Sequence, residues 1–554
     1  DLGTIGSPGH SMIYQVNTKP GLNFGFHSFD HLKFQADQTL YFDVKSPFTD
    51  LYYVLGPKDE EVLSVLHTQN INPLVNAGFN YQIGGTEGVY VRQVSKRLSF
   101  KAFTSIHSKN NRYHLNAQTI WNELSNDQSG GISQDSLFED SISITRKNIP
   151  VNLQNASSSE NQQVYELNQR YDFGKTTVVH VNDSVEEISF EGKLRIYHSA
   201  LLDKAALYYR DLSPDTAFYP TVLLETTGTD NKVHTRMLRN TIGFVSLDLN
   251  PLDKNRLNGG IAGVHEYIRY NRYRKDTNVY NGIVKGFVGN SMYSRFYWKF
   301  GADFTLEGIN ADDYRWELKT RYSNKRRSQY LDFFIAVQQR APAMIFYSYE
   351  GNHYIWKNLF LKQHNASVAL QYTIEKHHIN LGVRGDVISR FVFYNEDALP
   401  EQDLSELTVY AVHLAKDFYW KHFTFKNRIQ YQFTSGDATL RIPTFISSHS
   451  AYYHNFLFKK ALYMQIGVDL LFSKAYYADA YSPSTQQFYL QSTKLIGNYP
   501  YLDFFINAKI NQAKLFVKMS HANQGFFGKT YYSVLHYPRN DMSFIVGISW
   551  TFND

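Results

Sequence analysis

The stretch DMSFIVGISWTF at residues 541–552 is built from two unlike sets of alternate residues. One set is wholly apolar and aromatic: Phe544, Val546, Ile548, Trp550 and Phe552. The intervening residues are small and mostly polar, with two serines, a glycine and a threonine among them. A period of two predicts a β-strand whose two faces meet different surroundings.

The same two-faced pattern recurs along most of the chain, with charge on the polar face. Repeats lie at residues 296–304, 314–322, 331–337, 423–433 and 502–508. A soluble sandwich would also alternate, but 554 residues would then need several domains, and no Pro/Gly/Ser-rich linker divides the chain. Aromatic residues make up 16% of the sequence and often end the strands, which suits interfacial girdles. The sequence therefore predicts an all-β fold, a transmembrane antiparallel β-barrel of the Gram-negative outer membrane.

Strand number and domain boundaries follow from the spacing of these repeats. Membrane strands take about 9–11 residues, and we expect about 20–22 of them from residue 48 onward, within a range of about 18–24. Residues 48–554 are predicted to form one barrel. Residues 1–47 alternate poorly and are expected to form an irregular lead-in, periplasmic or lumen-facing, with short strands at 21–29 and 40–44. Long polar connections are predicted on the cell exterior at 126–160, 201–232, 342–355, 435–447 and 476–498.

The two faces of the strands predict two environments. The apolar face is expected to meet lipid, at Phe296, Trp298, Phe300, Phe544, Trp550 and Phe552. The charged face is expected to line the lumen, at Arg295, Lys299, Asp303, Arg315, Glu317, Lys319, Arg321, Lys426 and Arg428. Two interpretations of the charged face stay open: mutual compensation inside a wide or plugged barrel, and a solute path whose charges set selectivity. The slight basic excess hints at anionic solutes.

Several kinds of chemistry find no support in the sequence. Cysteine is absent, and no His-Glu-x-x-His or Gly-x-Ser-x-Gly motif occurs, so we expect no enzyme, no metal and no cofactor. The acidic turn at residues 248–255 lacks the glycine and distal glutamate of a calcium loop. Net charge is +5 and the basic residues are dispersed, which gives nucleic-acid binding little support. The chain begins at Asp1 without a leader, so we expect a mature chain.

Blocks in the first third of the chain are similar to a known family. They include LGTIGSP at 2–8, LSVLHTQN at 63–70, GGISQDS at 130–136 and LNQRYDFG at 167–174. In these blocks the chain resembles the putative porin family of Bacteroidota outer membranes. The resemblance implies an outer-membrane β-barrel more firmly than it implies transport, and it supplies no catalytic residues.

The leading functional hypothesis is a porin-like channel for passive or gated passage of small hydrophilic solutes. The alternative is a structural or accessory barrel subunit of a larger outer-membrane assembly for secretion, insertion or nutrient uptake. A TonB-dependent transporter is not expected, because no plug-sized domain precedes the first clear strand. The expected partners are outer-membrane lipid, lipopolysaccharide and envelope proteins of a complex. The solute and the oligomeric state stay open.

Overall fold

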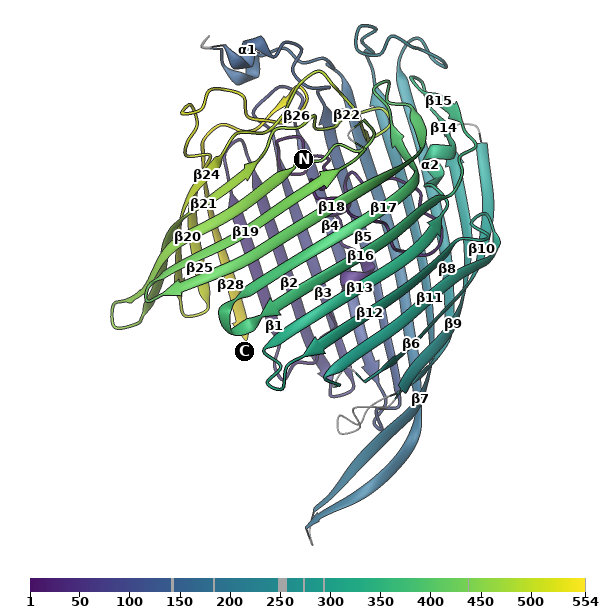
Figure 1. Ribbon diagram of the computed structural model, residues 1–554. Coiled ribbons are helices and arrows are strands. Elements are labelled where there is room, and N and C mark those ends of the chain that lie inside the picture. The colour runs from purple at the N-terminus through teal and green to yellow at the C-terminus, as the bar shows by residue number, and fades with distance from the viewer. Residues whose placement is uncertain are drawn as a thin grey trace.

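Twenty-two antiparallel strands close into one barrel in the computed structural model of the chain (Figure 1). The first strand, β1 (Phe48–Leu55), pairs with the last, β28 (Ser543–Asn553), which closes the sheet on itself. The all-β barrel and the predicted strand number are thereby confirmed. The structure describes residues 1–140, 144–182, 185–247, 257–272, 275–291, 294–436 and 438–553.

Each barrel strand pairs with the next one along the barrel. Between β1 and β28 the strands are β2 (Glu61–Asn72), β3 (Val75–Thr86), β4 (Ser95–His107), β5 (Tyr113–Gln128), β6 (Ala156–Asn182), β7 (Val185–Asp211), β8 (Thr229–Ser246), β9 (Leu257–Arg272), β10 (Lys275–Asn290), β11 (Phe296–Gly308), β12 (Tyr314–Ser323), β13 (Gln329–Arg340), β16 (Gln363–Ile374), β17 (Ile379–Tyr394), β18 (Pro400–Trp420), β19 (Phe423–Thr434), β20 (Phe445–Leu457), β21 (Leu462–Ser473), β24 (Tyr501–Ile510) and β25 (Ala513–Ser520).

Short elements lie in the connections and in the N-terminal segment. Three small hairpins are β14 (Ser348–Glu350) with β15 (Ile355–Lys357), β22 (Ala480–Ser482) with β23 (Gln487–Tyr489), and β26 (Tyr532–Val534) with β27 (Tyr537–Pro538). The helices are α1 (Ser136–Glu139), α2 (Met344–Tyr347) and the 3-10 turns η1 (Asp30–Leu32), η2 (Ala36–Gln38), η3 (Arg146–Asn148) and η4 (Glu375–His377). In the described part of the chain, no helix is long and apolar enough to cross a membrane.

The two ends of the barrel differ in the length of their connections. One end, called the loop end, carries residues 129–155, 212–228, 341–362, 435–444, 474–500 and 521–542. The other, called the turn end, carries tight connections such as 73–74, 421–422 and 511–512, and β28 finishes there (Figure 1). The predicted long connections all fall at the loop end, although parts of them belong to barrel strands, at residues 126–128, 156–160, 201–211, 229–232 and 445–447. Long loops outside and short turns in the periplasm are the rule for outer-membrane barrels.

Strands β6 and β7 are much longer than a bilayer requires. Their pairing continues past the point where β5 and β8 stop, so residues 174–182 and 185–192 pair only with each other. This hairpin projects from the turn end (Figure 1).

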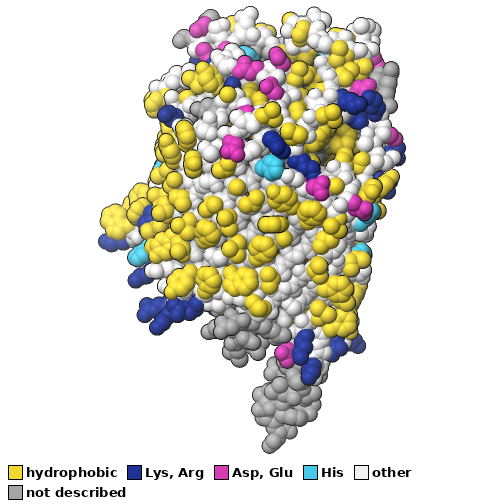
Figure 2. Space-filling model, turned by 45° about the vertical axis from the view of Figure 1, so that its right-hand side comes forward, with side chains coloured by type: hydrophobic (Ala, Val, Ile, Leu, Met, Phe, Trp, Pro, Cys, Tyr) yellow, Lys and Arg dark blue, Asp and Glu magenta, His cyan; other side chains and the backbone are white. Residues whose placement is uncertain are grey.

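The outer wall carries the apolar face of the strands. On β8 and β9 exposure alternates residue by residue, with Ile242, Phe244 and Ile261 exposed while Val264 and Ile268 are buried. Figure 2 shows apolar side chains over the middle of the wall and charged side chains gathered toward its two ends. Exposed apolar surface of this extent is stable only against hydrocarbon or another apolar surface.

Buried apolar clusters sit at the loop end, where long connections pack over the barrel mouth. One cluster joins Phe138 and Ile149 of residues 129–155 to Tyr531 of residues 521–542. A second joins Ile345 and Trp356 from residues 341–362 to strand residues of the wall. The loop end is thus a folded cap, while the interior below it is predominantly polar.

Residues 1–47 run along the inner face of the wall before entering β1. The segment's contacts, in chain order, are Met12 with β19, Asn17 with β13, Leu22 with β9, Lys33 with β6, Ala36 with β5 and Asp43 with β2. Its only regular structure is η1 and η2, within these fully described residues. The strands predicted at 21–29 and 40–44 are therefore wrong. The backbone of residues 22–24 bonds to the Glu266 side chain and to the backbone of α2, and the Val44 N–H bonds to the Asn70 side chain.

Candidate functional site

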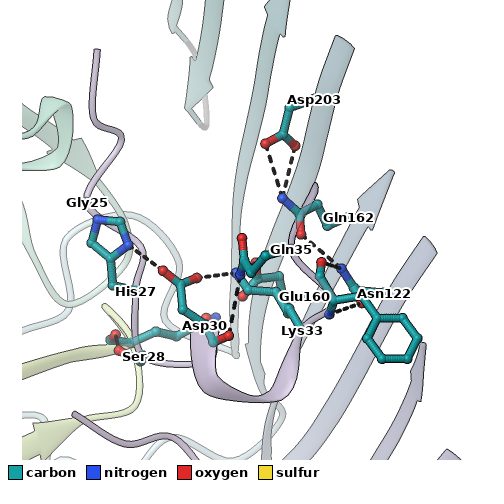
Figure 3. A network of polar contacts seen from close by, with 12 residues as sticks. Gly25, His27, Ser28, Asp30, Lys33, Gln35, Asn122, Glu160, Gln162 and Asp203 are labelled. Atoms are coloured by element: carbon teal, nitrogen blue, oxygen red, sulfur yellow. Dashed lines mark hydrogen bonds and ion pairs between the residues drawn. The ribbon is translucent and has the colours of Figure 1, made fainter. Parts of the chain in front are cut away.

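A buried ion pair joins the N-terminal segment to the wall. The Lys33 ammonium lies 2.7 Å from a Glu160 carboxylate oxygen on β6, and each side chain is only 4% exposed. Asp30, one turn earlier in η1, contacts the same ammonium at 2.7 Å and accepts a hydrogen bond from His27 when Nδ1 of that ring is protonated. Figure 3 shows this chain of contacts running from His27 into the wall. One cation of the segment is thus held between two carboxylates.

The electrostatics of this contact favour both charged forms. Burial alone would lower the pKa of Lys33, but the Glu160 and Asp30 carboxylates outweigh it and leave that pKa raised. Burial would raise the pKa of Asp30, whereas the hydrogen bond from His27 and the charge of Lys33 bring it to about 2. Lys33 and Asp30 are therefore ionised throughout the physiological range.

A second anchor lies on β9. The Glu266 side chain is fully buried and accepts hydrogen bonds from Arg239, from Asn281 and from the backbone N–H of Leu22. Gly21, just before Leu22, has φ +88°, and a Cβ there would lie 2.2 Å from a Glu266 carboxylate oxygen. Glycine is required because the backbone passes so close to the wall.

A cavity of about 750 Å³ separates the segment from strands β6–β8. Its polar lining includes Glu160, Glu166, Asp203, Lys33 and Arg239. Gln162, between them, donates to Asp203 at 3.1 Å and accepts from Asn122 at 3.1 Å (Figure 3). This side of the interior is therefore rich in carboxylates and amides.

A second cavity of about 400 Å³ lies against strands β9–β12, with Thr18 and Pro20 of the segment on its other side. Five predicted lumen residues line it, together with a further lysine: Lys299, Asp303, Arg315, Glu317, Lys319 and Lys285. Lys285, Asp303 and Arg315 stand directly opposite one another on successive strands. The row continues to Gln338, which accepts from Arg315 at 2.6 Å and donates to the carbonyl of Asn17 at 2.9 Å.

Both carboxylates of this second cavity are paired. Asp303 contacts Arg340 at 2.7 Å, and Glu317 contacts Arg315 at 2.9 Å and Lys319 at 2.8 Å. In the described structure, Lys285 and Lys299 have no carboxylate partner, and the ammonium of Lys299 lies 4.1 Å from the ring centre of Phe287. The cavity therefore carries a net positive charge.

The remaining predicted lumen residues lie away from this cavity. Arg321 pairs with Asp332 at 2.5 Å, one step nearer the turn end on β12. Arg428 pairs with Asp417 at 2.5 Å on β19 and β18, and Lys426 lies 5.7 Å from the ring centre of Tyr452. Most of these charges are thus compensated locally rather than gathered into one ring.

Arg295 has a different position from its predicted companions. It precedes β11, and its guanidinium donates to the hydroxyl of Tyr322, whose ring is half exposed on the outer wall. The alternation of β11 does not fix the direction of the Arg295 side chain, because Arg295 lies outside the paired residues of that strand.

The residues predicted to face lipid lie on the outer wall. Phe296, Phe300, Phe544 and Trp550 are exposed, whereas Trp298 and Phe552 are half-buried. Phe552 stacks on Trp550 with ring centres 4.5 Å apart. Their contact with hydrocarbon stays a prediction.

Sequence reasoning missed the residues that hold the N-terminal segment. Glu160 and Glu166 share one face of β6, and Tyr165 lies on the opposite, outer face. The alternation of this strand could therefore have indicated that the two glutamates face the interior. No such alternation indicated the position of Lys33, because the residues around it show no hydrophobic periodicity. No group of three or more His, Asp or Glu in the described ranges could hold a metal ion, and the acidic turn at residues 248–255 lies outside the described residues.

Three solved receptor and transporter structures are similar in fold to this chain. They are the siderophore receptor PirA from Acinetobacter baumannii (TM-score 0.64, 8% identity), the FrpB iron transporter from Neisseria meningitidis (0.61, 10%) and a mutant ferric enterobactin receptor PfeA from Pseudomonas aeruginosa in complex with enterobactin (0.63, 9%). The likeness covers 92% of this chain and 81% of PirA, or 82% of the other two. At such identities it shows the fold alone.

The family of the chain comes from its sequence. No curated protein matches it. The putative porin family matches it over residues 1–554, which is its whole length. With the closed barrel, this match places the protein in the Gram-negative outer membrane, in the class of channels and transporters. Its origin in the Bacteroidota stays a prediction. The chain belongs to the putative porin family.

Proposed function

We propose that the protein is a gated channel for small hydrophilic solutes and that residues 1–47 form its gate. The observation that carries the proposal is the polar attachment of this segment inside a closed barrel. The segment contacts the wall through hydrogen bonds and ion pairs and also through apolar side chains such as Phe29 and Leu32, and cavities of about 750 and 400 Å³ remain on its two sides. Polar contacts can be replaced by contacts with water, whereas the packing of Phe29 and Leu32 against Leu124 favours the resting position of the segment.

The proposed solutes are anionic. The smaller cavity carries four cations and two carboxylates, and the carboxylates are already paired. Lys285 and Lys299 are left to attract a mobile anion, as charged rings do in selective pores. The larger cavity, with its carboxylates, would hold the gate rather than the solute.

Planar bilayers provide the test. We expect ion currents from the purified protein, larger currents from Lys33→Ala, and a reversal potential that indicates anion preference in a salt gradient. Lys285→Gln with Lys299→Gln should reduce that preference. The matched control removes two lysines from the outer wall, Lys96→Gln with Lys232→Gln. Absence of current from both the native protein and Lys33→Ala at any voltage would sink the channel.

A second candidate, an accessory subunit of an outer-membrane assembly, is favoured by the β6–β7 hairpin. Unpaired strand edges are templates for pairing with another chain, and this hairpin presents two of them at the turn end. Replacing residues 174–192 by a tight turn should then remove a stoichiometric partner that co-purifies from native membranes. Retention of that partner, or the absence of one from the native protein, would contradict this role.

A further inference from the structure

Three cations stand directly opposite one another on the outer wall near the loop end. Lys204 on β7 pairs in register with Arg236 on β8, and Arg236 pairs with Arg269 on β9. Cβ atoms of opposed residues lie about 4.5–5.5 Å apart, and like charges in such positions repel. The two arginines are exposed and Lys204 is half-buried. This arrangement, called the cation row, is unfavourable unless an anion binds it.

Among the described residues, carboxylates compensate one end of the cation row only. Arg269 contacts Asp276 at 2.5 Å. In the described structure, Arg236 has no ion pair or hydrogen bond through its guanidinium, and Lys204 contacts only the Tyr165 ring, 5.9 Å from its centre. A hollow of about 440 Å³ lies over the row, and no carboxylate is among its lining residues.

Directly toward the turn end, the same strands expose apolar and aromatic side chains. Leu238 follows Arg236 by two residues, Tyr267 precedes Arg269 by two, and Tyr280 and Tyr165 occupy the same level on the neighbouring strands. All four are more than a third exposed. Two residues of a strand span about 6.6 Å. The cation row therefore lies one step above a belt of the kind that marks a membrane interface.

We propose that the cation row binds the phosphorylated headgroup of a lipid in the outer leaflet, of the bisphosphorylated lipid A class. The phosphate would accept hydrogen bonds from the two guanidiniums and the lysine, which relieves their repulsion. The acyl chains would lie along Leu238, Tyr267 and the exposed apolar residues nearer the turn end. The cation row matches the phosphorylated headgroup of such a lipid, and the apolar belt matches its acyl chains. A free anion would use the cation row but not the belt.

The test compares lipid retention by the detergent-purified, full-length protein, measured by native mass spectrometry. We expect bisphosphorylated lipid A to stay bound to the native protein and its affinity to fall about tenfold or more in the triple variant Lys204→Gln, Arg236→Gln, Arg269→Gln. The control triple variant, Lys325→Gln, Lys376→Gln, Lys460→Gln, removes equal charge at the turn end and should bind normally. Heat-modifiable migration on gels checks that each barrel is folded.

Three results would overturn the proposal. They are unchanged retention by the cation-row variant, equal retention of lipid A stripped of both phosphates, and an equal loss in the control. Displacement of the lipid by millimolar inorganic phosphate would make the row a site for free anions, which also contradicts a lipid headgroup. If the native protein retains the lipid and only the cation-row variant loses it, the site is supported. This result does not depend on whether the barrel conducts ions.

Discussion

Lys33→Ala should release the N-terminal segment from the inner wall. The substitution removes the cation that lies 2.7 Å from both Glu160 and Asp30, and the Glu160 side chain, 4% exposed, is then left charged without a partner. Removing one member of a buried pair typically costs about 3–5 kcal/mol. Because 1.4 kcal/mol corresponds to a factor of ten, the released population should rise on the order of 10²- to 10³-fold.

The absence of cysteine from the chain makes this population measurable. Ser28 is 7% exposed and its hydroxyl donates to the carbonyl of Gln486, so Ser28→Cys places a single protected thiol in the segment. Because position 28 lies against the connection 474–500, a maleimide reaches that thiol only when the segment leaves its resting position. The labelling rate in vesicles should therefore rise with the released population when Lys33→Ala is added.

Lys19→Ala is the matched control. Lys19 also belongs to the segment and pairs with Asp37 at 2.9 Å, but the two side chains are 76% and 59% exposed. Such surface pairs contribute about 0–1 kcal/mol, so labelling should change less than about fivefold. Lys33→Met with Glu160→Met should restore protection, because no charge stays buried. Equal labelling of Lys33→Ala and Lys19→Ala would refute the anchoring argument.

Three further outcomes follow from the same geometry. Gly21→Ala should also release the segment, because its Cβ would lie 2.2 Å from a Glu266 oxygen, and the same thiol assay measures this. Phe300→Arg should lower the free energy of unfolding in vesicles by about 2–4 kcal/mol near the middle of the apolar band, whereas Gly301→Arg on the inner wall should be close to neutral in urea titrations. Burial raises the pKa of Asp479 from its ordinary 3.8 to about 7, so the loop around it should lose stability as pH rises through that range.

Each of these outcomes has its own control. Gly263→Ala, on the same strand as Glu266 and with open space around its Cβ, should leave thiol labelling unchanged. Equal destabilisation by arginine at positions 300 and 301 would mean that the outer face does not meet hydrocarbon. For residues 474–500, hydrogen-exchange protection should be highest at low pH, fall between about pH 4 and 7, and become independent of pH in Asp479→Asn. Protection that increases with pH would contradict the burial of that carboxyl.

The alternation of apolar and polar residues in the strands was enough to predict the barrel from the sequence. Residues 541–552 alternate because one face meets an apolar medium and the other does not, and this constraint acts on every strand separately. The same alternation set Phe300 and Gly301 on opposite faces of β11.

The candidate site needed contacts that no local pattern encodes. Lys33 and Glu160 are 127 positions apart, and the irregular backbone around Lys33 has no period from which a direction could be predicted. Arg295 shows the same problem at a strand end, where pairing no longer fixes the side chain. Even among alternating residues, the sequence could not tell that Lys285 and Lys299 lack a carboxylate partner among the described residues while Glu317 has two cationic partners.

The sequence by itself therefore determined the barrel, its two faces and its approximate strand number, because a two-residue period is a local property that lipid imposes on each strand. Only the tertiary structure decided where residues 1–47 lie, which charges compensate one another and where three cations remain opposed. Those features depend on the register of all twenty-two strands and on the closure of β1 against β28, which place residues distant in sequence side by side.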